Sequence, residues 1–366
     1  MKILFFIGSL RSGGKERRLV ELLSYLKNKG GYEVKLVLAY NEIVYQKFNA
    51  LNIDVIALHK KQGKKSFSVF YQLYQICKDF RPDIIHTWGS MQTFYALPAK
   101  FLLNIPLVNS QIADVMGVER TSKFSNFINR VNFRFSDVIC SNSFAGLKAY
   151  RQDKDKRAVV VYNGLDNNRF VGLAKKNDIR QKYGISTLYA VVMTATYSKM
   201  KDWQRFVDIA IEVVGRRNDI TFIGVGAIAD EKMYNELSRQ VREYDNIKLQ
   251  DHCNEVENLV NACDVGVLFS TQGEGVSNTI LEYLALEKAV VVDRDGGTSE
   301  FVIEGYNGFF ANDKFIDEVA DLIIKLIDDE YLRLSLSANG KETISKKFTL
   351  EKMGSDFEKV YHNLRK

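Results

Sequence analysis

The sequence predicts an α/β protein with two doubly wound domains, each a parallel sheet covered by helices on both faces. Short apolar runs of β type alternate with segments of helical periodicity almost from end to end. The chain has 366 residues, too many for one comfortable core and a natural size for two domains. A hydrophobic content of 46% and a charged content of 26% are typical of an ordinary soluble globular protein.

The first half contains apolar runs that predict strands, and the segments between them have helical spacing. Leucines at positions 19, 22, 23 and 26, for example, fall on one face of a helix. The expected strands are 2–8, 33–40, 54–58, 83–88, 106–111, 137–142 and 158–162.

A polar stretch after the Asn163-Gly164 turn separates the two halves, and the alternation restarts beyond it. We therefore predict an N-terminal Rossmann-like domain at 1–165 and a C-terminal Rossmann-like domain at 166–345. A final helix at 346–366 begins near Thr349, a suitable N-cap. The strands expected in the second half are 189–197, 219–226, 247–252, 265–270 and 289–295, and the apolar positions of the final helix are Met353, Phe357, Val360 and Leu364.

Composition also limits the compartment and the chemistry. The cysteines and histidines are scattered without a paired spacing, which favours a reducing compartment and argues against a zinc site. The opening "MKILFFIGSL" is too short in apolar residues for a signal peptide, and no apolar run approaches the roughly 20 residues that span a bilayer. We expect a cytoplasmic protein.

The net charge of +6 conceals an imbalance between the halves. Residues 1–170 carry 26 Lys and Arg against 13 Asp and Glu, a net charge of +13, whereas residues 171–366 carry −7. A basic half of this kind fits nucleic acid, an anionic membrane surface, a phosphorylated substrate, or a solvated surface with no partner.

Loops that follow strands should carry the chemistry, because doubly wound sheets bind ligands at the carboxyl ends of their strands. Gly13 and Gly14 precede a helix, where backbone N–H groups can approach a phosphate or sugar, although a tight turn without a ligand is an equal alternative. Lys199 and Lys201 follow a strand, where an ammonium group can meet a diphosphate. The alternative is that both are solvated lysines on an exposed loop, with no ligand.

The stretch "GEGVSNTILE" at 273–282 contains two glutamates, Glu274 and Glu282, around a helix start at Ser277. Backbone N–H groups of 276–279 can bind an anion there with help from the helix dipole. Eight residues of helix span roughly 12 Å, about the length of a sugar–diphosphate–ribose unit. One glutamate could therefore hold a sugar and the other a ribose; the alternative is one solvated and one salt-bridged glutamate.

Two Asp-x-Asp stretches, at 153–155 and 293–295, match a metal motif only superficially. The second is followed directly by two glycines, so we interpret it as a strand end and a turn. No metal site is predicted.

Together the four strand-end loops resemble glycosyltransferase family 4, a family of retaining enzymes with two Rossmann-like domains that face a central cleft (the GT-B fold). "IGSLRSGGKERRLVELL" resembles its N-terminal glycine loop and first helix, and "VVVYNGLDNNRF" its interdomain signature. The stretch from "NEVENLVNACDVGVLFS" through "TQGEGVSNTILEYLALE" to "GGTSEFVIEGYNGFF" resembles its C-domain core, and "FTLEKMGSDFEKVY" its terminal helix that returns to the N-domain.

The resemblance implies that the domain at 1–165 binds the acceptor and the domain at 166–345 binds the nucleotide sugar. It also implies a role for each loop. Glu274 contacts hydroxyls of the donor sugar and is catalytic together with Lys201, which lies on the diphosphate, while Glu282 holds the ribose. The N-domain side is formed by Gly13 and Gly14. The backbone that meets the sugar and phosphates is that of Gly275, Val276, Ser277 and Asn278. Such enzymes need no metal and no cofactor beyond the nucleotide-sugar donor.

Two departures from the family pattern concern the diphosphate and the acceptor. Thr196 stands where the family has an arginine, so one diphosphate contact is missing or Lys199 replaces it. The histidine often found after the strand at 106–111 is absent, and Asp114 is the candidate acceptor residue there.

We therefore expect a retaining glycosyltransferase of cell-surface polysaccharide synthesis, for which the partners are a nucleotide sugar and a glycan or lipid-linked acceptor, and not nucleic acid. The alternatives are a nucleotide-sugar hydrolase or epimerase on the same fold, and a non-catalytic nucleotide-sugar-binding subunit.

Membrane contact is a further expectation, with the protein on the inner face of the cell membrane. Four lysines, at 60, 61, 64 and 65, precede an aromatic run, and "ERTSKFSNFINRVNFRF" sets basic residues beside apolar ones at helical spacing. The apolar positions are Phe124, Phe127, Ile128, Val131 and Phe135, and the basic ones Arg120, Lys123, Arg130 and Arg134. The alternative is that the phenylalanines face the core and the basic residues are merely solvated.

Overall fold

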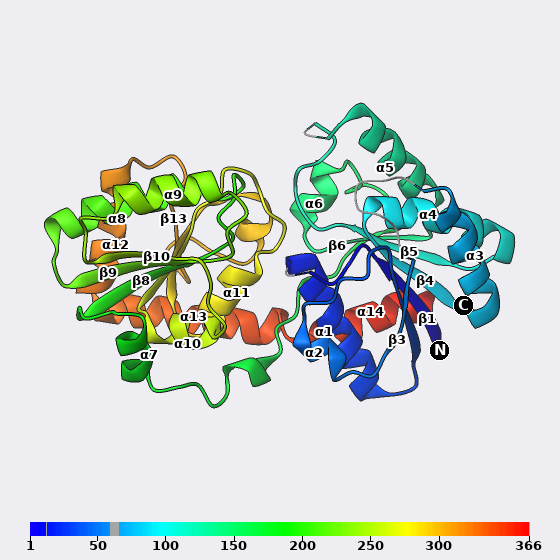
Figure 1. The fold of residues 1–366 in the computed structure, drawn as a ribbon, viewed down its shortest axis with the longest axis horizontal. Helices are drawn as coiled ribbons and strands as arrows, with labels where there is room; N and C mark the ends of the chain where they lie inside the picture. The colour runs from blue at the N-terminus through cyan, green and yellow to red at the C-terminus, as the bar shows by residue number, and fades with distance from the viewer. Residues whose placement is uncertain (12, 59–65, 120, 366) are drawn as a thin grey trace. The chain divides into compact units, whose positions relative to one another are not determined.

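The computed structural model describes residues 1–11, 13–58, 66–119 and 121–365. The chain forms two compact units (Figure 1): unit 1 comprises Met1–Asp166 with Thr349–Lys366, and unit 2 comprises Asn167–Phe348. Each unit is a parallel sheet with helices on both faces, so the predicted α/β class with two doubly wound domains is confirmed.

Unit 1 contains a seven-stranded sheet of order β3-β2-β1-β4-β5-β6-β7, in which every pairing is parallel. Its strands are β1 (Lys2–Ile7), β2 (Glu33–Leu38), β3 (Asp54–Ala57), β4 (Ile84–Trp88), β5 (Leu107–Ile112), β6 (Val138–Ser141) and β7 (Ala158–Val160). Its helices are α1 (Gly14–Lys29), α2 (Gln46–Asn49), α3 (Ser68–Phe80), α4 (Ser90–Leu103), α5 (Lys123–Phe135), α6 (Phe144–Ala149) and α14 (Leu350–Asn363).

The sheet of unit 1 is buried on both faces because its strands are almost continuously apolar. Alternate residues of β1 point to opposite sides. Phe5 belongs to a core with α1 and α14, whereas Phe6 belongs to a second core with α3 and α4. The leucines predicted to share one helix face all lie in the α1 core.

The terminal helix α14 packs against α1 within unit 1, as the family resemblance implies (Figure 1). Thr349 caps it, accepting a hydrogen bond from the Lys352 N–H at 3.1 Å. The buried His86 of β4 anchors it further through a 2.8 Å hydrogen bond between Nδ1 and the Tyr361 hydroxyl. Leu364 follows the helix end and is only partly buried.

Unit 2 repeats the plan with a six-stranded parallel sheet of order β10-β9-β8-β11-β12-β13. Its strands are β8 (Tyr189–Thr194), β9 (Ile220–Val225), β10 (Ile247–Gln250), β11 (Val265–Leu268), β12 (Ala289–Val292) and β13 (Phe309–Phe310). Its helices are η1 (Asn167–Phe170), α7 (Lys176–Lys182), α8 (Trp203–Arg216), α9 (Glu231–Gln240), α10 (Val256–Ala262), α11 (Asn278–Ala285), η2 (Gly296–Glu300), α12 (Ile316–Asp328) and α13 (Glu330–Lys347).

Each strand predicted from an apolar run is present, and β13 is the strand that the patterns missed. It has only two residues, too few to show a period. In the described part of the chain, no helix combines the length and the apolar character needed to cross a membrane.

Candidate functional site

Two strand-end loops of unit 2 lie side by side, the one after β8 and the one after β11. Lys201 forms an isolated antiparallel bridge with Ser270. On either side of it, the Asp202 N–H donates to the Phe269 carbonyl at 3.0 Å and the Thr271 N–H to the Met200 carbonyl at 3.1 Å. These backbone contacts fix the predicted diphosphate loop against the loop that carries Glu274.

Lys201 and Glu274, the two residues predicted to be catalytic, form an ion pair. Both side chains are largely buried, at 14% and 22% exposure. Burial lowers the pKa of Lys201 to about 8, and the nearby Asp293 carboxylate opposes that shift. In this arrangement the two charges neutralise each other, so a ligand that uses both must separate them.

A second ion pair lies beneath the first and holds the strand end in place. The Asp293 carboxylate accepts hydrogen bonds from the Ser270 N–H at 2.8 Å and from Arg205 at 3.1 Å. Burial raises the pKa of Asp293 to about 6. This carboxylate of the Asp-x-Asp stretch is therefore engaged by the protein itself.

The loop of Glu274 also rests on the turn after β12. The Gly297 N–H donates to the Glu274 carbonyl at 2.9 Å. Gly296 has a φ of +57°, and a Cβ there would lie 1.8 Å from the same carbonyl oxygen, so only glycine fits. The cavity left beside Glu274 has a volume of about 10 Å³, room for about one water molecule and not for a sugar.

Helix α11 begins directly after this loop. Ser277 is its N-cap, as predicted, although its side chain makes no capping hydrogen bond. The residues predicted to present their backbone to the donor, Gly275–Asn278, lie at this start and are buried or half-buried. The estimate of roughly 12 Å between the two glutamates assumed that both lie on one continuous helix. That assumption is wrong, because α11 begins only at Asn278 and Glu274 lies in the loop before it.

Glu282, the predicted ribose residue, is buried in α11 and forms an ion pair with Arg169 at 2.8 Å. Arg169 also pairs with Glu257 of α10. Burial works to lower the pKa of Arg169, but the two carboxylates outweigh it and raise that pKa above its ordinary value. The sequence analysis missed Arg169, because Glu257 is 88 residues away and no local pattern connects them.

Lys199 contrasts with Lys201 two positions later. Its side chain is exposed, and among the described residues it has no hydrogen-bond or ion-pair partner. Thr196, which replaces the family arginine, is exposed, and its carbonyl accepts from the Trp203 indole N–H at 3.1 Å. Lys199 thus has the freedom to reach a ligand, and its role stays a prediction.

In unit 1 the predicted residues lie at two strand ends. Gly13 precedes α1, and the Tyr45 hydroxyl bridges its backbone, accepting from the Gly13 N–H at 3.0 Å and donating to its carbonyl at 2.8 Å. Gly14 is the first residue of α1. Asp114 follows β5 and accepts from the Met116 N–H at 2.9 Å and the Tyr150 hydroxyl at 3.0 Å.

No group of three or more His, Cys, Asp or Glu residues in the described ranges could hold a metal ion. In the other Asp-x-Asp stretch, Asp155 is bound by Arg157. The four cysteines are free. Independence from metal ions stays a prediction.

Comparison with known proteins identifies the family. Residues 12–169 match the model "Glycosyltransferase Family 4", and residues 175–343 match the model "Glycosyl transferases group 1". The chain is 34% identical over 329 residues, 85% of its length and 86% of the relative's, to the N,N'-diacetylbacillosaminyl-diphospho-undecaprenol alpha-1,3-N-acetylgalactosaminyltransferase of Campylobacter jejuni. It belongs to glycosyltransferase family 4.

Solved structures agree on the fold. A glycosyltransferase from Rickettsia africae superposes with a TM-score of 0.87 at 20% identity, covering 100% of this chain and 98% of that one. HepE from Anabaena, solved in complex with UDP, superposes with a TM-score of 0.85 at 22% identity, covering 99% and 100%. The predicted GT-B fold is therefore confirmed, and the protein is a glycosyltransferase.

Proposed function

We propose that the protein is a retaining enzyme that transfers a sugar from a nucleotide-diphosphate sugar to a lipid-linked glycan during cell-surface polysaccharide synthesis. The observation that carries this proposal is the Lys201–Glu274 ion pair beside the start of α11. An ammonium group and a carboxylate lie together at the strand ends of a doubly wound unit, where ligands of such sheets bind. This supports the proposal, because an ammonium group can bind a diphosphate and a carboxylate can accept hydrogen bonds from sugar hydroxyls.

In the proposed reaction the donor separates this pair. Lys201 and the start of α11 hold the diphosphate, and Glu274 accepts hydrogen bonds from the sugar. The bond between the anomeric carbon and the diphosphate oxygen then breaks, the acceptor oxygen bonds to the same face of that carbon, and its proton passes to the departing diphosphate. The ammonium group and the helix dipole stabilise the negative charge that develops on the leaving group. No metal takes part.

A lipid-linked acceptor is supported by the Campylobacter relative, whose name describes a diphospho-undecaprenol substrate. An exposed face of unit 1 supports it independently. Phe124, Phe127 and Phe135 of α5 are exposed, so the alternative that these phenylalanines face the core is wrong, whereas Ile128 is buried. Phe101 of α4 lies in edge-to-face contact with Phe135, at 5.2 Å between ring centroids.

Basic residues surround this apolar face. Lys123, Arg130 and Arg134 of α5 are all exposed. A helix with phenylalanines and cations on its exposed surface can lie on an anionic leaflet, with the cations on phosphates and the rings at the acyl boundary. Lys60, Lys61, Lys64, Lys65 and Arg120, which were expected to contribute, lie outside the described residues.

Product analysis tests the proposal. Wild-type protein is incubated with UDP-, GDP- and ADP-sugars, starting with UDP because the Anabaena neighbour was solved with it, and with lipid-diphosphate-linked glycan acceptors. We expect a longer glycan with retained anomeric configuration, also in excess EDTA. Free sugar alone would indicate a hydrolase, an altered nucleotide sugar an epimerase, and binding without turnover a non-catalytic subunit. A strict Mn²⁺ or Mg²⁺ requirement would contradict the metal-free mechanism.

A further inference from the structure

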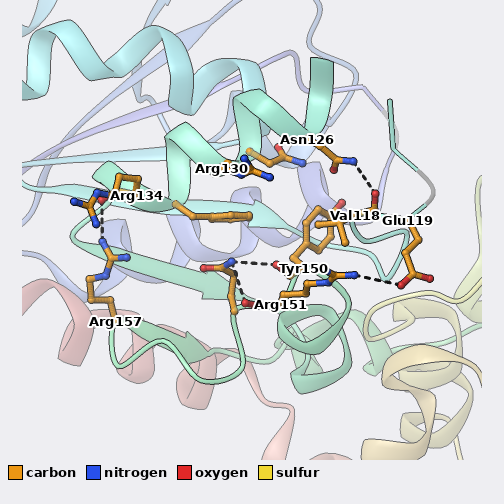
Figure 2. Close-up of a pocket in the computed structure, with 11 residues that line it drawn as sticks. Val118, Glu119, Asn126, Arg130, Arg134, Tyr150, Arg151 and Arg157 are labelled. Carbon is orange, nitrogen blue, oxygen red and sulfur yellow. Dashed lines mark hydrogen bonds and ion pairs between the residues drawn. The ribbon is translucent and has the colours of Figure 1, made fainter. Parts of the chain in front are cut away.

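Unit 1 contains a cavity of about 530 Å³ that none of the predicted site residues lines (Figure 2). We call it the α5 pocket. Helix α5 forms one wall, and the segment from the end of α6 to the start of β7 forms the other. Phe133 and Tyr150, in edge-to-face contact at 6.1 Å between ring centroids, supply aromatic surface. Arginines line both walls: Arg130, Arg134, Arg151 and Arg157.

These arginines differ in what they already bind. Arg157 is structural, since it pairs with Asp155 and donates to the carbonyls of Arg134 and Ser136. Among the described residues, the Arg151 side chain makes a single ion pair, an exposed contact with Glu119 at 3.6 Å. Such a contact between solvated side chains contributes little energy and yields readily to another anion.

Arg130 and Arg134 are the unneutralised charges of the pocket. Neither side chain has a hydrogen-bond or ion-pair partner among the described residues. They stand one helical turn apart, a spacing at which like charges repel and weaken a helix. The sequence of α5 contains no acidic residue that would offset this repulsion. An anion bound between the two guanidinium groups would offset this repulsion.

Phosphate is the anion that this geometry favours. A guanidinium group presents paired N–H donors that match two phosphate oxygens, and several arginines around one cavity are typical of phosphate recognition. The cavity has room for more than a single phosphate. The aromatic surface of Phe133 and Tyr150 suits the less polar part of a larger ligand.

Tyr150 connects the α5 pocket to the candidate acceptor residue. Its ring lines the pocket, and its hydroxyl donates a hydrogen bond to Asp114 at 3.0 Å. A ligand in the pocket therefore contacts a side chain that directly positions Asp114.

We propose that the α5 pocket binds the phosphate-bearing end of the acceptor, with Arg130, Arg134 and Arg151 on the phosphate oxygens. This assignment of the acceptor as the source of the phosphate rests on the proposed function. The pocket itself is a phosphate site distinct from the diphosphate site of unit 2, because its residues belong to unit 1. An anionic phospholipid headgroup is the other source of the same chemistry.

Arginine labelling read residue by residue tests the pocket without interference from unit 2. Full-length protein is modified with phenylglyoxal, and the rate at each arginine is followed by peptide mass spectrometry. Inorganic pyrophosphate at about 5 mM, against a dissociation constant on the order of 1 mM, should slow the modification of Arg130 and Arg134 about sixfold. Arg239, exposed on α9 and without a side-chain partner among the described residues, should keep its rate.

Two further experiments distinguish the acceptor from an anionic phospholipid headgroup as the source of the phosphate. Vesicles of phosphatidylglycerol in phosphatidylcholine test the headgroup. Arg130→Gln/Arg134→Gln tests the acceptor, with Lys148→Gln as its control, because Lys148 is an exposed cation of α6 that does not line the pocket. We expect the double variant to raise the KM for a lipid-diphosphate acceptor at least about tenfold, with donor KM unchanged, and Lys148→Gln to leave both near the wild-type values.

The proposal is overturned if pyrophosphate protects neither arginine, if it protects Arg239 equally, or if only the anionic vesicles protect. Protection in a protein that transfers no sugar would support the phosphate site and overturn the proposed function alone. If the double variant is active and its KM for the acceptor equals that of the wild type, the assignment of the pocket to the acceptor is overturned.

Discussion

The two units share one plan but treat charge in opposite ways. In unit 2 the central charges are buried and paired: Lys201 with Glu274, Arg169 with Glu282 and Glu257, and Arg205 with Asp293. In unit 1 the cations of α5 are exposed and without partners among the described residues, beside exposed phenylalanines. Unit 2 supplies its own counter-ions, so its ligand must compete with them, whereas unit 1 presents charge that a ligand can neutralise.

Energetics make this difference measurable. Removing one partner of a buried ion pair leaves an uncompensated charge and costs about 3–5 kcal/mol, whereas an exposed charge contributes about 0–1 kcal/mol. Substitutions of the same kind should therefore damage folding when they are made at these ion pairs of unit 2 and leave folding nearly intact when they are made at the cations of α5.

Arg169→Met is the substitution for which we expect the largest effect. It removes the Arg169 cation from the buried carboxylate of Glu282 and the half-buried carboxylate of Glu257, so the stability of unit 2 should fall by about 3 kcal/mol or more. Urea unfolding followed by a unit 2 probe, Trp203 fluorescence with Trp88 replaced by Phe, measures it. Arg130→Met in the same background is the matched control and should change stability by less than about 1 kcal/mol. Equal losses would remove the contrast between the units.

Lys201→Ala should reduce turnover by about an order of magnitude or more, because a cation on the leaving diphosphate stabilises the transition state. Lys199→Ala, two positions away on an exposed side chain, serves as its comparison in the same transfer assay. A larger loss from Lys199→Ala would mean that Lys199 has taken over the role of the arginine that Thr196 replaces.

The pH dependence of nucleotide binding sharpens this assignment. The pKa of Lys201 is lowered to about 8, so the ammonium form is present below that pH and is lost as the pH rises through it. Affinity for a nucleoside diphosphate should therefore decline above about pH 8. Lys201→Arg stays protonated throughout and should give a flat profile by calorimetry. A flat profile for the wild type would argue against contact between Lys201 and the diphosphate.

Membrane binding should give the smallest effect per residue. Each cation near an anionic surface adds about 1 kcal/mol, screened over roughly 10 Å at ordinary ionic strength. Co-sedimentation should need anionic lipid and fade at high salt. It should weaken when Lys60, Lys61, Lys64 and Lys65 become serine, or in Phe124→Ser/Phe127→Ser, with nucleotide affinity unchanged.

The matched control for the apolar change lies in unit 2. Tyr331→Ser/Leu334→Ser also removes two exposed apolar side chains but has no basic helix of this kind around it. If wild-type protein ignores anionic vesicles at low salt, the membrane proposal fails and a water-soluble acceptor becomes the better hypothesis.

The sequence was sufficient for most of the fold, because apolar runs of β type are local signals. Lys201 and Glu274 could be singled out for the same reason, because each lies in a loop between a strand end and a helix start, and Glu282 lies inside the helix that follows the loop of Glu274. Arg169 could not, since it acts through partners that only the folded chain brings to it. A salt-bridged glutamate was among the alternatives, but its partner could not be predicted. Lys201 and Glu274 follow different strands, β8 and β11, and only the contact between the two loops brings them together.

The α5 pocket was missed for a related reason. Arg130 and Arg134 were visible as the basic side of an amphipathic helix. Arg151 and Arg157 lie in the separate loop between α6 and β7. Only the packing of that loop against α5 creates a cavity. Periodicity reports which face of a helix is apolar, but it does not report what stands opposite that face.

The proposed donor site depends most on separate roles for the two glutamates of unit 2, Glu274 on the sugar and Glu282 on the ribose. Calorimetry with a free nucleoside diphosphate tests that division directly. Glu274→Gln should bind the nucleotide like the wild type while losing most sugar transfer, because Glu274 is assigned to the sugar. Glu282→Ala should weaken nucleotide binding itself by about 1.5–3 kcal/mol, as expected when a charged hydrogen bond is lost. Equal losses of nucleotide affinity in the two variants would contradict the division.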